Sequence, residues 1–292
     1  MLTCIADIIL YILLCSLQTE NANRVFAYVK AHRGKLPLRH FVTRSNAAGE
    51  MMVMLSLSPV DVQSIAGELM QTFSFVKSVY ACRLAFRPAH ALDGKCIHLA
   101  GAQTLTETLC GLTFSVSPQS FFQVNHEQTE ILYRTALSFA QLTPQDEIAD
   151  VYCGAGTISL AAARECKHVT GIEIVPEAIR DANLNARVNH LENKTTFLCA
   201  DAAQAYPALQ KKHAFSAVIV DPPRKGLDAS VTESLIASPA SRLVYVSCNP
   251  ATLARDVKLL TSSGAYRFIT AQPVDMFPKT EHVETVVLLS RR

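Results

Sequence analysis

The chain is predicted to be an α/β protein, with a doubly wound, Rossmann-like parallel sheet in its C-terminal part and an α+β domain before it. Two observations predict this class. From Glu147 onward, short β-branched, apolar segments alternate with helical patterns, which is typical of a parallel sheet covered by helices. Acidic residues follow several of these segments, at the sheet edge where parallel α/β proteins bind ligands. The 292 residues, 49% of them hydrophobic, are enough for one large and one smaller packed domain.

The N-terminal α+β domain is expected to cover residues 1–114, and the larger domain residues 115–292. The apolar run 1–16 contains Asp7, lacks a basic segment before it and is too short to span a bilayer. We therefore predict a helix packed on the core there. Further along this domain, strands are predicted at residues 39–44, 50–56 and 76–81, and helices at 22–31 and 60–72.

In the larger domain, strands and helices are predicted to alternate regularly. Pro176 suits the first turn of one of the helices. The last two strand-like segments have no helix between them, which predicts a terminal antiparallel hairpin. The predicted strands are 147–152, 168–174, 195–200, 214–220, 242–248, 266–273 and 283–290, and the predicted helices are 157–164, 176–189 and 251–260.

A glycine-containing turn between the first strand and the first helix predicts a nucleotide-type site. Its sequence, DVYCGAG, has no third glycine, so it is not the dinucleotide fingerprint. Glu173 closes the second strand, where a carboxylate can accept from both hydroxyls of a ribose, and Asp201 closes the third, near an adenine amino group. This arrangement suits S-adenosylmethionine better than NAD. Each acid taken singly is equally expected to cap a helix.

The fourth strand of the larger domain ends at Asp221-Pro222-Pro223-Arg224. Two prolines stiffen this loop, and the aspartate can form hydrogen bonds with a flat polar group. An Asn-Pro-Pro-Tyr sequence at this place would indicate methylation of an exocyclic amine, whereas the Asp and Arg version does not.

Cys248 stands at the carboxyl end of the fifth predicted strand, immediately before a helix. A thiol there faces the ligand crevice, and the positive end of the helix favours its thiolate form. This position predicts a nucleophile. The alternative is a small buried residue, since free cysteine is among the most buried types.

The composition adds few constraints. The nine cysteines are scattered, without a CxxC pair or a zinc-site spacing, which is the usage of a reducing cytoplasm. The net charge of +2 permits an anionic partner without requiring one. The basic stretch within residues 30–44 is as well explained by a solvated surface as by a nucleic-acid contact.

Six ordered segments resemble the RNA (uracil-5-)-methyltransferases, and among them most closely the branch that modifies 23S ribosomal RNA. The resemblance is strong over residues 113–292 and looser upstream, through LPLRHFVTR and GEMMVML. The segments that carry it are SPQSFFQVN (117–125), DVYCGAGTISL (150–160), GIEIVPEAI (171–179), DPPRKG (221–226), YVSCNP (245–250) and HVETV (282–286).

The resemblance implies a fold of the S-adenosylmethionine-dependent methyltransferase type, an RNA-facing N-terminal domain and specific residue roles. Cys248 matches the nucleophile and Glu284 the general base. The cofactor is expected to be S-adenosylmethionine. Four residues match positions that line the cofactor site or the reaction cleft: Gln123, Tyr152, Glu173 and Asp221. Thr157 and Asp201 match cofactor-binding positions less closely.

Many members of this family begin with a small RNA-binding barrel and a four-cysteine iron–sulfur motif. Neither is visible here: Cys4 matches at most the last cluster ligand, and no iron–sulfur cluster is predicted.

The implied reaction is addition of Cys248 to carbon 6 of a uridine, methylation at carbon 5 and proton removal by Glu284. We predict a cytoplasmic monomer that acts on 23S ribosomal RNA and binds no membrane. Transfer RNA is the alternative substrate, and a catalytically silent RNA-binding factor is a further alternative. DNA cytosine methylation is disfavoured, because Cys248 follows Ser247 rather than a proline.

Overall fold

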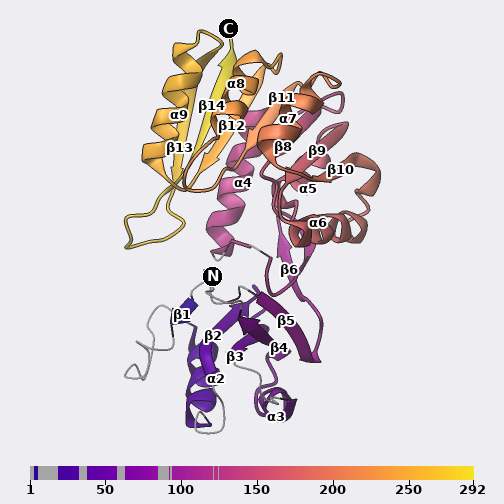
Figure 1. Cartoon of the computed structure of the whole chain (residues 1–292), viewed down its shortest axis with the longest axis vertical. Coiled ribbons are helices and arrows are strands. Elements are labelled where there is room, and N and C mark those ends of the chain that lie inside the picture. Colours follow the sequence, from indigo (N-terminus) through magenta and orange to yellow (C-terminus); the bar gives the residue numbers. More distant parts are fainter. Residues whose placement is uncertain are drawn as a thin grey trace. The chain divides into compact units, whose positions relative to one another are not determined.

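The computed structural model describes residues 3–5, 19–32, 38–57, 63–84, 92, 94–120, 122–123 and 125–292 (Figure 1). The chain divides into two compact units. One comprises Met1–Glu107 and Ser115–Phe122, and the other comprises Thr108–Phe114 and Gln123–Arg292. The division therefore crosses the chain three times, whereas the sequence places a single boundary after residue 114. The crossings lie around the β-hairpin formed by β6 (Leu105–Leu109) and β7 (Leu112–Val116).

The N-terminal unit contains a five-stranded sheet in the order β1-β2-β3-β4-β5, in which only β3 and β4 run parallel. Central strand β3 is apolar almost throughout because the sheet is covered on both faces: Met51, Val53 and Leu55 belong to one buried cluster, and Met52 and Met54 to another. The elements of this unit are β1 (Thr3–Ile5), α2 (Glu20–Ala31), β2 (Leu38–Ser45), β3 (Met51–Leu57), α3 (Gln63–Thr72), β4 (Val76–Leu84) and β5 (Gly94–Gly101).

One expectation for this unit is wrong, and one feature of it was not predicted. Thr3–Ile5 is a strand paired antiparallel with β2, where a helix over residues 1–16 was predicted, and the rest of that run lies outside the described residues. Strand pairing overrides the local apolar pattern, which fits a short strand as well as a helix. Cys82 and Cys96 form a disulfide, which the cysteine spacing in the sequence does not predict. The two residues face each other in the β4–β5 register, which the sequence does not reveal.

The C-terminal unit is built on a seven-stranded sheet in the order β10-β9-β8-β11-β12-β14-β13. Every pair is parallel except β12–β14 and β13–β14, so the predicted terminal antiparallel hairpin is confirmed. Strand β14 lies between β12 and β13. The strands are β8 (Glu147–Val151), β9 (His168–Glu173), β10 (Thr195–Cys199), β11 (Ala217–Val220), β12 (Arg242–Ser247), β13 (Tyr266–Val274) and β14 (Glu284–Arg291).

Helices cover both faces of this sheet, as its fully buried strand β11 requires (Figure 1). One group contributes Tyr206, Leu235 and Leu253 to the core cluster that also holds the β12 residues Leu243 and Tyr245. The helices are α4 (His126–Ala140), α5 (Thr157–Ala163), α6 (Pro176–Val188), α7 (Ala202–Gln210), α8 (Ala229–Ala237) and α9 (Pro250–Ser262), with a 3-10 turn at Glu192–Lys194.

The predicted doubly wound Rossmann-like fold is therefore confirmed. Helices α4, α7 and α8 were not predicted; α7 contains Pro207, which disfavours a helix interior. Over the described residues, no helix is long and apolar enough to cross a membrane.

Candidate active site

The turn after β8 is formed by residues in the left-handed region of backbone conformation. Tyr152, Gly154 and Gly156 have φ values of 71°, 54° and 77°. A Cβ on Gly156 would lie 2.9 Å from Phe197 Cζ, so this position requires glycine for space as well as for conformation. A Cβ on Gly154 would meet nothing within 4 Å. The backbone at Gly154 therefore borders open space beyond the end of β8.

Glu173 closes β9 and faces this turn. One carboxylate oxygen accepts from Gly154 N at 3.2 Å, and the other accepts from Ile174 N and Val175 N at 2.8 and 2.9 Å. The backbone thus fixes the carboxylate, while its remaining lone pairs stay available to hydroxyl donors. The side chain of Ile174 is 61% exposed, which places an apolar surface beside the carboxylate. Ile174 carries no functional signal in the sequence, where it has the pattern of the last residue of a strand.

The other predicted cofactor residues have different surroundings. Asp201 is exposed and accepts from Ala203 N at 2.9 Å, so it is the N-cap of α7, which is the alternative that the sequence left open. The Thr157 hydroxyl lies 2.8 Å from the hydroxyl of Tyr133 on α4. Half-buried Gln123 lies three residues before α4 begins. The side chain of Tyr152 packs against the buried cluster of the C-terminal unit.

Beneath the turn, Asp150 is almost fully buried and accepts from Ser159 Oγ at 2.5 Å. Burial raises the pKa of its carboxyl group to about 6, against hydrogen bonds from Ser159 that lower it. This hydrogen bond joins β8 to α5, the two elements that the turn connects.

Two acidic side chains and the cysteine come together where β11 and β12 end and β14 begins: Asp221, Glu284 and Cys248. Ser247 pairs with Thr285 across the antiparallel β12–β14 ladder, so Cys248 and Glu284 occupy the next pair of positions. Glu284 is only 4% exposed, and burial raises its pKa, against the opposing effect of the Arg224 cation. The carboxyl group of Asp221 is surrounded by protein although part of the residue is exposed. Burial, and then Glu284 and Asp150, raise the pKa of Asp221 well above its usual range.

The pKa of the Cys248 thiol is raised, first by burial and then by the carboxylates of Glu284 and Asp221. The sequence-based expectation that the start of α9 favours a thiolate is therefore wrong for the protein without ligands. The carboxylates and the partial burial outweigh the helix end. Arg224 acts in the opposite direction and lowers the pKa of Cys248. Its guanidinium Nη2 lies 3.3 Å from His282 Nε2.

This arrangement brings together a thiol and two carboxyl groups, one of them buried, at the edge of the sheet where the β8 turn also lies. The sequence profile of the tRNA (Uracil-5-)-methyltransferase family matches residues 103–292. The chain belongs to this family. The predicted resemblance to the RNA (uracil-5-)-methyltransferases is thereby confirmed.

Curated relatives support this membership. An uncharacterized RNA methyltransferase of Enterococcus faecalis is 41% identical over 261 residues, which are 87% of this chain and 56% of that protein. An uncharacterized RNA methyltransferase of Halalkalibacterium halodurans is 40% identical over 294 residues, 94% of this chain and 63% of that protein. The chain thus spans roughly 56–63% of the length of these two relatives.

Solved structures show the same fold. The Pyrococcus abyssi tRNA (uracil-54, C5)-methyltransferase, in complex with S-adenosyl-L-homocysteine, aligns with 95% of this chain and 69% of its own, at a TM-score of 0.81 and 27% identity. The tRNA m1G37 methyltransferase of Methanocaldococcus jannaschii aligns with 94% of this chain and 78% of its own, at a TM-score of 0.58 and 15% identity, which supports the fold alone.

S-adenosylmethionine is the cofactor of the family, and the residues present fit it. Gly154 leaves room beside the turn, Glu173 presents fixed acceptors for ribose hydroxyls, and Ile174 offers an apolar surface for a flat base. Among the residues that the structure describes, no group of three or more His, Cys, Asp or Glu side chains is arranged to hold a metal ion.

Proposed function

We propose that this protein methylates carbon 5 of a uridine in RNA with S-adenosylmethionine, through a covalent bond between Cys248 and carbon 6. The observation that carries this proposal is the placement of Cys248 and Glu284 at neighbouring positions of the β12–β14 ladder. A nucleophile and a base so close together can act on adjacent atoms of one pyrimidine ring.

The chemistry follows from the reactivity of uracil. Carbon 5 becomes nucleophilic only when a thiolate has added to carbon 6, and Cys248 supplies that thiolate. S-adenosylmethionine provides an electrophilic methyl group for carbon 5. Glu284 then removes the proton from carbon 5, and elimination of Cys248 restores the ring. The raised pKa of Glu284 suits a base that works near neutral pH.

Asp221 and Arg224 complete the proposed site. Asp221, whose raised pKa favours its protonated form, can donate a hydrogen bond to a polar edge of the base. A uridine within folded RNA must leave its stack to reach these groups. Arg224 and Lys225 are exposed and can also contact flanking phosphates.

We propose 23S ribosomal RNA as the substrate, on the sequence resemblance to that branch, and a cytoplasmic monomer as the active form. Transfer RNA is the second candidate, and the similarity to the P. abyssi tRNA (uracil-54, C5)-methyltransferase favours it. The cofactor contacts proposed for Gln123, Tyr152 and Thr157 rest on the resemblance, whereas that of Glu173 is also supported by the open turn that it faces.

The test is methyl transfer from labelled S-adenosylmethionine to unmodified ribosomal RNA and transfer RNA, with digestion to nucleosides. We expect 5-methyluridine, and a loss of at least about 10³-fold in Cys248→Ala. The RNA that accepts the label identifies the substrate class. A chain that binds the cofactor but labels neither RNA would contradict the proposal and favour a silent RNA-binding factor.

A further inference from the structure

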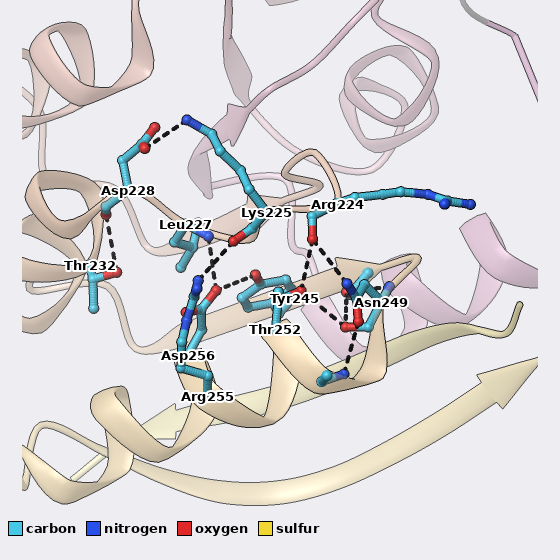
Figure 2. Close-up of polar contacts among 12 residues, drawn as sticks. Arg224, Lys225, Leu227, Asp228, Thr232, Tyr245, Asn249, Thr252, Arg255 and Asp256 are labelled. Carbon is cyan, nitrogen blue, oxygen red and sulfur yellow. Dashed lines mark hydrogen bonds and ion pairs between the residues drawn. The ribbon is translucent and has the colours of Figure 1, made fainter.

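The loop 221–227 joins β11 to α8 and carries Asp221 and Arg224 into the site. It has no regular secondary structure, and residues 223–225 are exposed. A turn within it is closed by Gly226 N, which donates to Pro223 O at 2.8 Å. Three further backbone groups of the loop, the carbonyls of Arg224 and Lys225 and the N–H of Leu227, are bonded to side chains of α9 and of its N-cap Asn249 (Figure 2).

Each of these bonds has a defined partner. Arg224 O accepts from Asn249 Nδ2 at 3.1 Å and from Thr252 Oγ1 at 3.2 Å. Lys225 O accepts from Arg255 Nη2 at 2.9 Å, and Leu227 N donates to Asp256 Oδ2 at 2.8 Å. The donors and acceptor lie on one face at the start of α9, and we refer to them as the α9 clamp: Asn249, Thr252, Arg255 and Asp256.

The clamp is itself fixed. Asp256 is 1% exposed and also accepts from the hydroxyl of Tyr245 at 2.7 Å, while its second oxygen accepts from Arg255 Nε at 2.8 Å. Tyr245 lies on β12, three residues before Cys248. The strand that carries the nucleophile therefore holds the same aspartate that holds the loop.

Gly226 shows how closely the loop approaches α9. A Cβ there would lie 2.5 Å from Arg255 Nη2, 2.5 Å from Asp256 Oδ2 and 3.1 Å from Thr252 Cβ, and its φ is 79°. Any side chain at Gly226 must therefore displace either the loop or the clamp side chains that hold it.

The loop held by the clamp carries the side chain of Arg224. Figure 2 shows its side chain extending away from its own carbonyl group, which the clamp holds. Its guanidinium is the cation that acts on both Cys248 and Glu284. Asp221, by contrast, is anchored to the sheet, since its N–H donates to Val151 O at 3.3 Å.

We propose that the α9 clamp positions the Arg224 guanidinium for Cys248 and Glu284, so that its members are positioning residues of the reaction. This inference rests on the proposed function. The clamp residues join the proposed site because their side chains form hydrogen bonds with the loop. Gly226 permits the close approach of the loop to these side chains.

The experiment compares Gly226→Ala with Gly264→Ala in the full chain. Gly264 has a φ of 78° and open space around its Cβ position, so both variants carry the same backbone strain and only the first displaces the clamp. The first measurement is the pH dependence of Cys248 alkylation by iodoacetamide, followed by peptide mass spectrometry. It requires neither RNA nor methyl transfer. The second is kcat for methyl transfer.

We expect Gly226→Ala to move the alkylation curve to higher pH, because Arg224 no longer favours the thiolate, while Gly264→Ala follows the wild type. We expect kcat to fall about 10- to 100-fold in Gly226→Ala alone. Identical curves and rates in the two variants would overturn the inference. A wild-type protein without methyl transfer would contradict the proposed function, whereas the alkylation curves would still test the clamp.

If Gly226→Ala does not fold, Thr252→Val and Thr252→Ser give the same test. Valine keeps the shape but loses the hydroxyl that donates to Arg224 O, whereas serine keeps the hydroxyl. A shift to higher pH in the valine variant, reversed in the serine variant, supports the positioning role. Equal curves for valine, serine and wild type would refute it.

Discussion

Cys248, which directly follows β12, and Glu284, the first residue of β14, lie one step beyond the paired residues Ser247 and Thr285, although 36 residues separate them in the sequence. Burial, and after it the carboxylates of Glu284 and Asp221, raise the pKa of the thiol, whereas the Arg224 cation lowers it. The proposed base therefore disfavours the thiolate form of the proposed nucleophile, and Arg224 opposes this effect. This relationship leads to the first prediction.

Glu284→Gln is expected to abolish release of methylated RNA and, at the same time, to make Cys248 more reactive. Removal of the carboxylate lowers the pKa of the thiol, so alkylation moves to lower pH. Without a base, the proton on carbon 5 stays and Cys248 cannot leave. A covalent protein–RNA species should then accumulate on denaturing gels in the presence of S-adenosylmethionine.

Glu281→Gln is the matched control, because Glu281 is exposed and lies three residues earlier, in the loop that leads into β14. It should alkylate and turn over like the wild type. Full turnover by Glu284→Gln would assign the base to another residue.

Glu173→Gln is expected to weaken binding of S-adenosylmethionine about 10- to 100-fold, since a hydrogen bond to a charged acceptor contributes roughly 1.5–3 kcal/mol. The glutamine oxygen can still accept from Ile174 N and Val175 N, whereas the bond from Gly154 N is lost with the second carboxylate oxygen. Isothermal titration calorimetry measures the change. The control is Glu177→Gln, which alters an exposed pair with Arg180 on α6. Equal affinities in both variants would remove Glu173 from the cofactor site.

Gly171→Ala is expected to destabilise the C-terminal unit by about 1–3 kcal/mol through overpacking. A Cβ on Gly171, in the middle of β9, would lie 2.6 Å from Phe197 Cδ1 and 2.8 Å from Cys153 Sγ. Gly67→Ala in α3 is the contrasting change: its Cβ meets nothing within 4 Å, and alanine favours a helix by roughly 0.8–1 kcal/mol. Urea unfolding of both variants measures the change in the free energy of unfolding, which should decrease for Gly171→Ala and increase for Gly67→Ala. A neutral Gly171→Ala would show that Phe197 can move aside.

Asp150→Asn is expected to change how stability depends on pH. The pKa of Asp150 is about 6 in the folded protein and near 3.8 when unperturbed, so the folded state holds this proton more tightly. That contribution is present below about pH 4 and is lost as the pH rises through about 6. The free energy of unfolding of the wild type, minus that of the variant, should fall by roughly 1–3 kcal/mol over this window.

Asp146→Asn should show the opposite slope in the same unfolding series. Burial raises the pKa of Asp146, but hydrogen bonds from Ser216 and Thr143, together with the Arg242 cation, lower it by more, so the overall shift is downward. Asp146 therefore stabilises the folded protein above its ordinary pKa, and this contribution is lost as the pH falls through the lowered pKa of the folded state. Parallel curves for the Asp146 and Asp150 variants would contradict the account of both carboxyl groups.

The strand and helix alternation of the larger domain was predictable from sequence because buried parallel strands need continuous apolar segments, as in β11 and β12. The same reasoning placed Glu173 and Cys248 at strand ends. It failed at Thr3–Ile5, where pairing with β2 decides the conformation. It also missed α7, in which tertiary packing of Tyr206 outweighs an internal proline.

The sequence by itself determined the family, the order of the motifs and the residue types that the chemistry requires, since all of these are local properties of the chain. The tertiary structure alone decided which residues meet. Insertion of β14 between β12 and β13 brings Glu284 to Cys248. Burial among carboxylates sets the protonation of the thiol, and Asp256 joins β12, α9 and the 221–227 loop. These relationships depend on distances between segments far apart in the chain, and on the local dielectric and charge that packing creates.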